Sequence, residues 1–384
     1  MRKLRMGMIG GGPGAFIGAV HRTAATMDGL IELVCGAFSS SPEKSKSMAT
    51  ELALPEERVY GTWEEMIEKE KGLPADQRME IVSIVTPNHV HFAPAKAAME
   101  AGFDVVMDKP MTFDLAEAKE LQTVVEASGR LFCLTHTYTG YPLVKEAREQ
   151  VRSGRIGKVR KIFVTYPQGW LSHFKEATGD KQAAWRTDPA RSGAAGAMGD
   201  IGTHAFNLTE YVTGLQVTAL CAQLNIVVEG RQLDDDGAVL LQYNNGATGV
   251  LMASQIMAGE ENNLTIKVYG ENGGLMWRHA DPNSLDLRLL DQPYQTLRAG
   301  NDYLSAAARH NTRTPWGHPE GFFEAFANHY RNFALCVTAR NEGNEPKREW
   351  TDFPGIEDGV RGMAFIENVL RSGQSEQKWT PFAV

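Results

Sequence analysis

Cysteine is scarce in this chain of 384 residues, which contains only four. No two of them form a Cys-x-x-Cys pair or a spacing typical of metal ligands, so the sequence predicts neither a disulfide framework nor a zinc site. We expect reduced cysteines in the core, no bound metal and a cytoplasmic location. The four residues are Cys35, Cys133, Cys221 and Cys336.

Long apolar runs, basic clusters and internal repeats are also lacking. No apolar run is long enough to span a bilayer, so we expect no membrane contact. The basic start at Met1 to Arg5 resembles a signal peptide, but Gly10 to Gly14 interrupt the apolar core that a signal peptide needs. A net charge of −8 without clustered Lys and Arg argues against a nucleic-acid partner. The length predicts two globular domains.

The most informative stretch is a glycine-rich turn that begins at Gly10. A short apolar run precedes this turn, and a helical pattern from Ala19 follows it. Glycines allow a tight turn and a close approach to a pyrophosphate, and a helix N-terminus offers free N–H groups. The alternative is a glycine-rich surface loop. The residues expected to bind a dinucleotide here are Gly10, Gly12, Pro13, Gly14, Ala15, Phe16 and Ile17.

The second predicted strand, residues 31–38, ends in a run of serines. In dinucleotide-binding folds an acidic residue at this point binds the ribose 2′-OH, whereas a 2′-phosphate requires a cation nearby. Here Ser39 takes the place of the acid, with Ser40 and Lys44 close by. These residues predict a ribose site that accepts NAD or NADP, with NAD slightly favoured. The serines also fit the N-cap of a helix that begins near Pro42.

The third predicted strand, residues 80–85, is strongly apolar and runs into a polar segment. This pattern is typical of a central parallel strand, and ligands bind at the carboxyl ends of such strands. The alternative is a Pro-Asn turn in which His91 caps a helix. The residues expected to contact the cofactor here are Thr86, Pro87, Asn88 and His91.

A fourth strand, residues 103–107, ends in Asp108-Lys109-Pro110. The alternation of strand and helix from Leu4 onward places this segment on the same sheet edge as the glycine turn. Lys109 is therefore a candidate active-site cation and not an ordinary surface lysine. Asp108 is expected beside the cofactor. Together, the four strands and a last one at residues 131–134 predict a doubly wound parallel sheet of the Rossmann type.

The pattern changes after residue 135, which we take as the domain boundary. Strand candidates then cover 159–166, 219–228, 238–243, 248–256 and 264–269, with hairpin turns at Asn245-Gly246 and Asn272-Gly273. Successive hairpins predict a mainly antiparallel sheet. The chain is thus expected to be α/β, with a dinucleotide-binding domain at 1–135 and an α+β domain at 136–384.

Asp200 and His204 are four residues apart in a segment with a helical pattern. On a helix they share one face, where the carboxylate can orient the imidazole and favour its protonated form. Such a pair suits a general base that acts near neutral pH. Taken alone, it is also typical of a helix N-cap beside a buried histidine.

Together these motifs resemble those of the glucose–fructose oxidoreductase and inositol dehydrogenase family (Gfo/Idh/MocA). The resemblance rests on the glycine turn, the segment Thr86 to His91, the segment Ala97 to Gly102 that leads to Asp108-Lys109-Pro110, and the Asp-xxx-His pair. It implies a Rossmann domain at 1–135 and a substrate-binding and oligomerisation domain at 136–384. The second domain would contain an open antiparallel sheet, through which a dimer or tetramer would form. Two residues depart from the pattern: Asp108 replaces the usual Glu, and Ser39 replaces the usual acid.

The resemblance assigns catalysis to Lys109, Asp200 and His204. His204 would be the base, Asp200 would orient it, and Lys109 would hold the developing alkoxide. Aromatic and cationic residues nearby suit a sugar pocket, and Trp185 with Arg186 suits the cofactor. The acidic run Asp234 to Asp236 is expected to be a solvated turn and not a cation site. The expected substrate-binding residues are Lys109, Tyr138, Trp170, Arg186, Asp200, His204 and His318.

The resulting hypothesis is an NAD(P)-dependent oxidoreductase that acts on a secondary hydroxyl of a sugar, inositol or glycoside. A second hypothesis is a glycosidase that oxidises a sugar transiently, eliminates the aglycone and reduces the product again. Tyr138 and His136, where the family more often has Asn and Arg types, leave this alternative open. A third is a regulator that senses NAD(P) or a sugar without catalysis, against which the intact Lys109, Asp200 and His204 argue.

Overall fold

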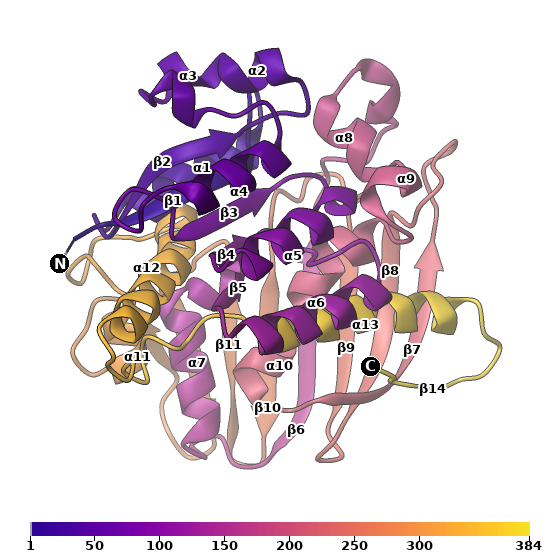
Figure 1. Cartoon of the computed structure of the whole chain (residues 1–384). Helices are drawn as coiled ribbons and strands as arrows, with labels where there is room; N and C mark the ends of the chain where they lie inside the picture. Colours follow the sequence, from indigo (N-terminus) through magenta and orange to yellow (C-terminus); the bar gives the residue numbers. More distant parts are fainter. Residues whose placement is uncertain (1) are drawn as a thin grey trace. The chain divides into compact units, whose positions relative to one another are not determined.

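A computed structural model describes residues 2–384 and divides into two compact units. The first unit contains the residues up to Gly140 together with Phe322–Val360. The second unit contains Tyr141–Gly321 and Arg361–Val384. Each unit is built around one β-sheet (Figure 1).

The first unit is built on a parallel sheet of five strands in the order β2-β1-β3-β4-β5. All neighbouring strands are parallel, as the alternation of strands and helices predicted. The chain leaves β1 for β2 on one side and returns to β3 on the other, so the strand order reverses between β1 and β3. Ligands bind at the carboxyl ends of strands at such a switch point. The strands are β1 (Leu4–Gly10), β2 (Ile31–Ala37), β3 (Ile81–Val85), β4 (Asp104–Met107) and β5 (Phe132–Leu134).

Helices connect these strands. The predicted cap before Pro42 is present, because the Ser41 side chain accepts a hydrogen bond from the Lys44 backbone N–H. The α-helices of this part are α1 (Phe16–Thr26), α2 (Pro42–Lys46), α3 (Met48–Glu51), α4 (Trp63–Gly72), α5 (Phe92–Glu100) and α6 (Leu115–Ser128).

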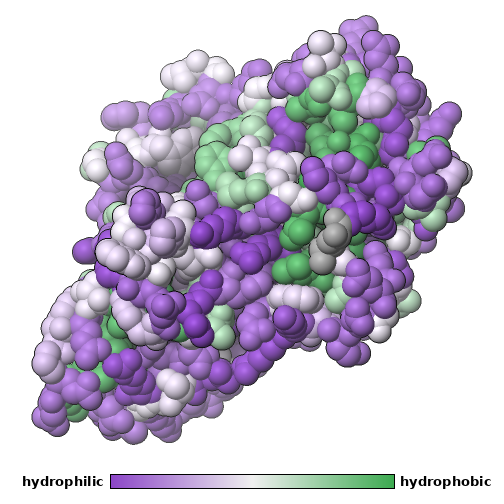
Figure 2. Space-filling model, turned by 90° about the vertical axis from the view of Figure 1, so that its left-hand side faces the viewer, coloured by the Kyte–Doolittle hydropathy of each residue, from purple (hydrophilic) through white to green (hydrophobic). Residues whose placement is uncertain are grey.

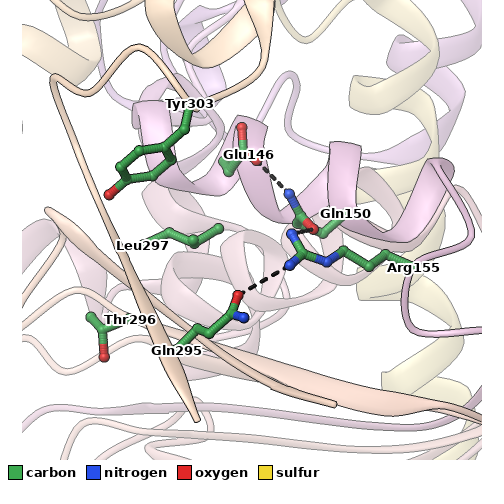
Figure 3. Close-up of a pocket in the computed structure, with 7 residues that line it drawn as sticks. All are labelled: Glu146, Gln150, Arg155, Gln295, Thr296, Leu297 and Tyr303. Atoms are coloured by element: carbon green, nitrogen blue, oxygen red, sulfur yellow. Dashed lines mark hydrogen bonds between the residues drawn. The ribbon is translucent and has the colours of Figure 1, made fainter. Parts of the chain in front are cut away.

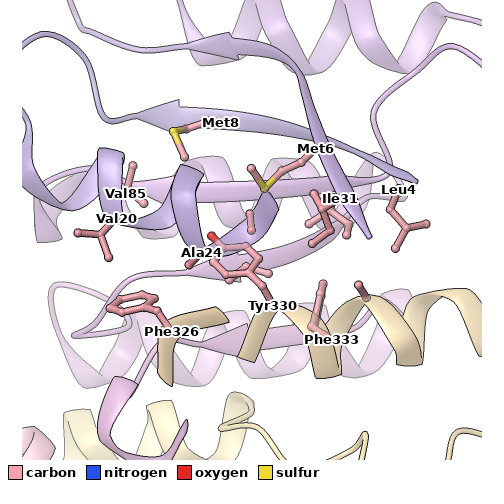
Figure 4. Close-up of a cluster of buried hydrophobic side chains, with 14 of the residues drawn as sticks. Leu4, Met6, Met8, Val20, Ala24, Ile31, Val85, Phe326, Tyr330 and Phe333 are labelled. Carbon is pink, nitrogen blue, oxygen red and sulfur yellow. The ribbon is translucent and has the colours of Figure 1, made fainter. Parts of the chain in front are cut away.

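The core of the first unit includes a helix from the far end of the sequence, α12 (Phe322–Asn341). Its apolar residues Phe326, Tyr330, Phe333 and Val337 recur at the spacing of one helix face and join a buried cluster with β1 and α1. Figure 4 shows these rings facing Val20 and Ala24 of α1 and the methionines of β1.

This packing differs from the expected domain division, which assigned all of 136–384 to a second domain. Residues 322–360 join the first unit because the stripe on α12 is buried against the first unit's own core and not against the second sheet. The contact crosses more than 300 residues of sequence, so no local pattern indicates it.

The second unit is built on a nine-stranded sheet in the order β13-β12-β11-β10-β6-β9-β8-β7-β14. The prediction of a mainly antiparallel sheet is confirmed: every neighbouring pair is antiparallel except β6 and β9, which are parallel. Hairpins occur at both predicted turns. The strands are β6 (Val159–Pro167), β7 (Val217–Asn225), β8 (Asp236–Tyr243), β9 (Thr248–Ser254), β10 (Thr265–Gly270), β11 (Gly273–Arg278), β12 (Ser284–Leu289), β13 (Gln295–Arg298) and β14 (Thr380–Pro381).

One face of this sheet is covered by helices and the other is open. The α10 helix packs on β6, β9 and β10, and α7 packs on β11 and β12. On the opposite face, Phe163, Leu240 and Tyr269 are exposed. The helices are α7 (Pro142–Arg152), α8 (Lys181–Arg186), α9 (Pro189–Ser192), α10 (Thr203–Thr213), α11 (Ala306–His310) and α13 (Ile356–Gly373), whose first turn falls in the first unit.

Hydrophobic side chains on the face drawn in Figure 2 form separate patches among hydrophilic ones. Across residues 2–384, no helix combines the length and the apolar character needed to cross a membrane. The four cysteines are free thiols, of which Cys221 is half-buried and the other three are buried.

Candidate active site

The glycine turn connects the end of β1 to the start of α1. Gly10, Gly11 and Gly14 have positive φ angles of 88°, 72° and 75°. A Cβ on Gly18 would lie 2.3 Å from the Cα of Gly11, and a Cβ on Gly12 would lie 2.5 Å from the Phe38 carbonyl oxygen. The turn therefore requires glycine for both conformation and space.

The geometry of this turn fits a dinucleotide phosphate. Among the described residues, no side chain caps the N-terminus of α1, whose N-cap residue is Ala15. The N–H groups of its first turn, with the positive end of the helix dipole, face the glycine turn. The adjacent residues Pro13 and Phe16 are exposed, with Phe16 at 65%. This arrangement is a cradle in which a pyrophosphate can bind close to the backbone.

The serine segment after β2 contains no acidic side chain. The Ser39 hydroxyl accepts a hydrogen bond from the Ser41 backbone N–H at 3.2 Å, while Ser40 and Lys44 are exposed. Hydroxyl groups can bind a ribose hydroxyl, and the lysine supplies a positive charge. The segment is therefore chemically compatible with the ribose of NAD and with the 2′-phosphorylated ribose of NADP.

The segment after β3 contains a buried polar atom that fits a ligand. Within residues 2–384, the Thr86 hydroxyl has no hydrogen-bond partner, although it is buried. A buried hydroxyl without a hydrogen-bond partner costs free energy, which a ligand that bonds to it can recover. Thr86 lies next to Val85, which pairs with Gly10 at the end of β1. A cofactor at the switch point can satisfy this hydroxyl.

The structure gives His91 a different place from the one expected. The sequence assigned it to the cofactor, but its ring is buried, with Nδ1 2.8 Å from the Pro110 carbonyl oxygen and Nε2 2.8 Å from the Thr86 carbonyl oxygen. Burial lowers the pKa of His91, against the opposing effect of Asp108. Since protein carbonyls occupy both nitrogens, His91 connects the loops after β3 and β4.

Asp108 and Lys109 directly follow β4. The Asp108 carboxylate accepts a hydrogen bond from Thr135 Oγ1 at 3.0 Å and lies 3.9 Å from His21 Nε2. Burial alone would raise the pKa of Asp108, but His21, Lys109 and His91 together hold it well below its usual range. Asp108 is therefore a carboxylate at neutral pH. Its contacts lie within the protein, which differs from the expected direct contact with a cofactor.

The residues after β5 are buried. Burial, reinforced by the positive charge of Lys109 and by His329, lowers the pKa of His136 to about 3. This histidine is therefore neutral at pH 7. Tyr138, expected to bind substrate, is also buried, and its short 3₁₀ helix (Thr137–Gly140) packs on α12.

The second unit contains the Asp-xxx-His pair. The sequence predicted an ordinary helix there, but Met198–Gly202 forms a π-helical turn that continues into α10. Asp200 lies in this turn, and His204 is buried in the first turn of α10. The His204 ring lies 6.3 Å from the ring of Tyr166. π-helical turns occur frequently at functional sites.

Two donors meet on one oxygen of Asp200. Arg186 Nε lies 3.5 Å from Asp200 Oδ2, and Gln255 Nε2 donates to the same oxygen at 2.8 Å. The guanidinium of Arg186 also stacks over the ring of Trp185 at 4.3 Å. The structure therefore brings three predicted residues, Trp185, Arg186 and Asp200, into one cluster. It adds Gln255, which no local pattern marks because it lies 55 positions further along the chain.

Two further predicted substrate residues of the second unit are Trp170 and His318. The Trp170 ring has Lys175 Nζ 5.8 Å from its centroid. His318 is exposed on a loop that Glu320 closes by accepting a hydrogen bond from the Thr314 N–H at 2.6 Å. Trp316 on the same loop is 70% exposed.

The acidic run at 234–236 is not the solvated turn that the sequence indicated. Asp234 and Asp235 are buried, because their carboxylates accept hydrogen bonds from backbone N–H groups. In residues 2–384 no group of three or more His, Cys, Asp or Glu side chains is arranged to hold a metal.

A separate pocket of about 500 Å³ lies in the second unit beside α7 and β13 (Figure 3). Its polar groups bond to one another: Gln150 donates to Glu146, and Arg155 donates to both Gln150 and Gln295. None of the predicted site residues lines it. The lining residues are Glu146, Gln150, Arg155, Gln295, Thr296, Leu297 and Tyr303.

Comparison with protein families gives two matches. The model described as "Oxidoreductase family, NAD-binding Rossmann fold" (GFO_IDH_MocA) matches residues 4–136. The model of the GFO/IDH/MocA C-terminal domain matches residues 144–276.

Individual proteins are similar over most of the chain. An uncharacterized oxidoreductase, YfiI of Bacillus subtilis, is 31% identical over 99% of this chain and 97% of its own length. Levoglucosan dehydrogenase of Pseudarthrobacter phenanthrenivorans is 26% identical over 75% of this chain and 76% of its own. The crystal structure of an inositol dehydrogenase homolog from Azotobacter vinelandii in complex with NAD⁺ superimposes with a TM-score of 0.94, at 32% identity, covering 99% and 98% of the two chains. A crystal structure of an inositol dehydrogenase homolog from Azotobacter vinelandii complexed with NADH and myo-inositol superimposes with a TM-score of 0.91, at 32% identity.

Proposed function

Since this chain belongs to the Gfo/Idh/MocA family of oxidoreductases with an NAD-binding Rossmann domain, we propose that it transfers a hydride between a nicotinamide cofactor and a secondary hydroxyl of a sugar, inositol or glycoside. The observation that carries the proposal is the register of the parallel sheet. Gly10 pairs with Val85 and Ile84 pairs with Met107, so the glycine turn, Thr86 and Lys109 all follow strand ends at one edge.

The residues proposed to hold the cofactor lie along that edge. The glycine turn would bind the pyrophosphate, Ser39, Ser40 and Lys44 the adenosine ribose, and the Thr86 to Asn88 segment the nicotinamide side. When bound, the nicotinamide ring accepts or donates the hydride. The hydroxyl-rich ribose segment supports NAD or NADP, with NAD slightly favoured.

The protein's own residues would move the proton and stabilise charge. His204 would take the proton of the substrate hydroxyl, and Asp200 would orient the imidazole and balance its positive charge. Lys109 would place a positive charge beside the oxygen as negative charge grows there. Each role is typically responsible for about a 10²- to 10⁴-fold acceleration.

Substrate selection is assigned to the second unit. Arg186 can donate hydrogen bonds to ring hydroxyls, and Trp170 offers an aromatic face for a sugar ring. His318 sits on a loop whose ends are held by Glu320, so it can present its ring without a large ordering cost. The buried Tyr138 would contribute through packing.

The proposal includes a homodimer or homotetramer formed through the open face of the nine-stranded sheet. Phe163 and Tyr269 contact each other on this face, with ring centroids 6.3 Å apart, and Leu240 is exposed on β8. Exposed apolar patches of this kind mark interfaces between proteins. Sedimentation analysis tests it: the Leu240→Lys variant is expected to shift towards monomer, and a wild-type monomer would refute the interface.

Absorbance in the reduced-nicotinamide band tests the activity. Purified protein is mixed with NAD or NADP and, separately, with myo-inositol, levoglucosan, other free sugars or aryl glycosides. Growth of reduced cofactor with one polyol is the expected result, and the two cofactor arms measure the preference. Release of aglycone without net reduced cofactor would instead establish the glycosidase. A result with neither cofactor reduction nor aglycone release would favour a regulator.

A further inference from the structure

Asp234 binds the start of the π-helical turn that carries Asp200. Its carboxylate accepts hydrogen bonds from the backbone N–H of Gly196 at 2.6 Å and of Met198 at 2.8 Å. Its own carbonyl oxygen accepts one from the N–H of Ala197 at 2.7 Å. Three consecutive amides are thus held by one residue that lies 36 or more positions away.

The contact is close and buried. A Cβ on Gly196 would lie 2.1 Å from the Asp234 carbonyl oxygen, so only glycine allows this approach. Asp234 is 7% exposed, and burial raises the pKa of its carboxyl, while the N–H groups of Met198 and Gly196 oppose that rise. Removing this buried carboxyl would leave two backbone N–H groups without an acceptor, which costs free energy. The hydrogen bonds therefore hold the start of the turn in place.

The neighbouring Asp235 anchors Asp234 in the second unit. Its carboxylate accepts hydrogen bonds from the N–H groups of Val227 and Val228, each at 2.9 Å. It also pairs at 3.1 Å with Arg231, whose side chain is almost fully buried and which binds Glu176 as well. The segment before β8 is therefore held by several charged hydrogen bonds.

Gln255 completes the arrangement from the end of β9. Its backbone N–H donates to the Asp235 carbonyl oxygen at 2.9 Å, and its side chain donates to Asp200 Oδ2 at 2.8 Å. Gln255 is only 3% exposed, so its side chain has little freedom. The strands β8 and β9 pair Asp236 with Ser254, which places Asp235 beside Gln255.

We infer that Gln255 and Asp234 are positioning residues for the reaction: Gln255 fixes the carboxylate of Asp200, and Asp234 fixes the turn on which it is carried. The inference rests on the proposed role of Asp200 and His204. Because Gln255 at the end of β9 and Arg186 of α8 both approach Oδ2, the plane of the carboxylate is set by neighbouring elements and not by the short turn alone. A misplacement of a reacting group by about 1 Å is enough to slow a reaction about 10²-fold.

Steady-state kinetics of Gln255→Leu tests the inference. We expect kcat to fall about 10- to 100-fold, while KM and the NADH dissociation constant, measured by fluorescence, change less than about 3-fold. Gln223→Leu is the matched control, because Gln223 is exposed on β7. Wild-type kcat in Gln255→Leu, or an equal loss in the control, would overturn the role of Gln255.

Gln255→Glu provides a readout that a purely structural role would not give. A second carboxylate would repel Asp200 until the two groups share a proton. The activity of Gln255→Glu relative to wild type should therefore rise as the pH falls from 8 to 6. A ratio that does not change with pH contradicts the inference.

Hydrogen exchange measured by mass spectrometry separates this inference from the proposed activity. In Asp234→Asn an amide NH₂ faces one of the two backbone donors, so peptides covering 196–202 should exchange about 10-fold faster. Asp302→Asn, an exposed substitution, should leave them unchanged. If the wild type transfers no hydride but these peptides respond, the proposed function fails and the structural contact stands. Unchanged exchange in Asp234→Asn refutes the contact itself.

Discussion

The two units of this protein position their candidate functional residues in different ways. In the parallel sheet, candidate residues directly follow strand ends, so that Gly10, Thr86 and Lys109 share one edge through strand register alone. In the second unit, Asp200 lies outside the nine-stranded sheet, in a π-helical turn, and its carboxylate is held by Gln255 and Arg186. The first arrangement depends on topology, and the second depends on individual side-chain contacts.

This difference predicts which substitutions each unit tolerates. The first unit should lose function when a substitution adds atoms where its backbone segments approach closely. Most substitutions of single side chains along its sheet edge should have little effect. The second unit should lose function when single polar contacts are removed, even where the fold is preserved.

The proposed reacting residues should give the largest losses. His204→Ala and Lys109→Ala are each expected to lower kcat/KM by about 10³-fold, because proton transfer and charge stabilisation are lost. NADH affinity, measured by fluorescence titration, should stay within a few fold for His204→Ala. Lys119→Ala, an exposed substitution on α6, is the control. Activity within 3-fold of wild type in either variant would remove that residue from the mechanism.

Backbone space in the first unit should give the next largest effect. Gly18→Ala places a Cβ 2.3 Å from Gly11 and should weaken NADH binding at least about 10-fold and destabilise the fold by roughly 1–3 kcal/mol. Gly72→Ala is the matched control, because nothing lies within 4 Å of its added Cβ. Calorimetry and NADH fluorescence measure both effects. Equal behaviour of the two variants would mean that the turn is not tightly packed.

A change of charge at the ribose segment should have an intermediate effect. Ser39→Asp places a carboxylate where a 2′-phosphate would lie, so the preference for NAD over NADP should increase about 10-fold or more. The ratio of kcat/KM values for the two cofactors measures it. Ser47→Asp, on the exposed side of the α2 to α3 junction, should not alter the ratio. If the ratio of the two kcat/KM values is unchanged in Ser39→Asp, the adenosine ribose does not bind at Ser39.

The smallest predicted effect concerns pH. His136 is buried with a pKa of about 3, whereas an unfolded histidine titrates near 6.5. Between these pH values the unfolded chain binds the additional proton, so stability falls as the pH decreases through this range. His136→Gln should therefore lose a few degrees less than wild type in melting temperature between pH 7 and pH 5. An identical pH dependence in both proteins would show that His136 does not control acid stability.

Much of the fold could be predicted because its signals are local. Apolar runs followed by glycine or polar residues identified all five parallel strands, and the Asn-Gly dipeptides identified two hairpins. The packing of α12 in the first unit could not be predicted, because its apolar stripe fits either sheet and only long-range contacts decide. The expected substrate domain was therefore continuous, whereas the second unit is not.

The candidate site shows the same limit. The glycine turn and Lys109 each belong to a motif of consecutive residues, so they could be predicted from the sequence. His91 was assigned to the cofactor because a histidine at a strand end can face either way, and only the carbonyls of Thr86 and Pro110 show which way it faces. Asp234 and Gln255 reach the Asp200 segment across 36 or more residues, so their neighbours in sequence give no signal.

Isotope transfer shows whether the hydride moves directly from a substrate carbon to the cofactor. The protein is incubated with NAD⁺ and a polyol deuterated on carbon, chosen as the most active compound in the absorbance assay, and the reduced cofactor is analysed by mass spectrometry. We predict one deuterium in each molecule of reduced cofactor. Reduced cofactor without deuterium, or no reduced cofactor with any polyol, would contradict direct hydride transfer by this protein.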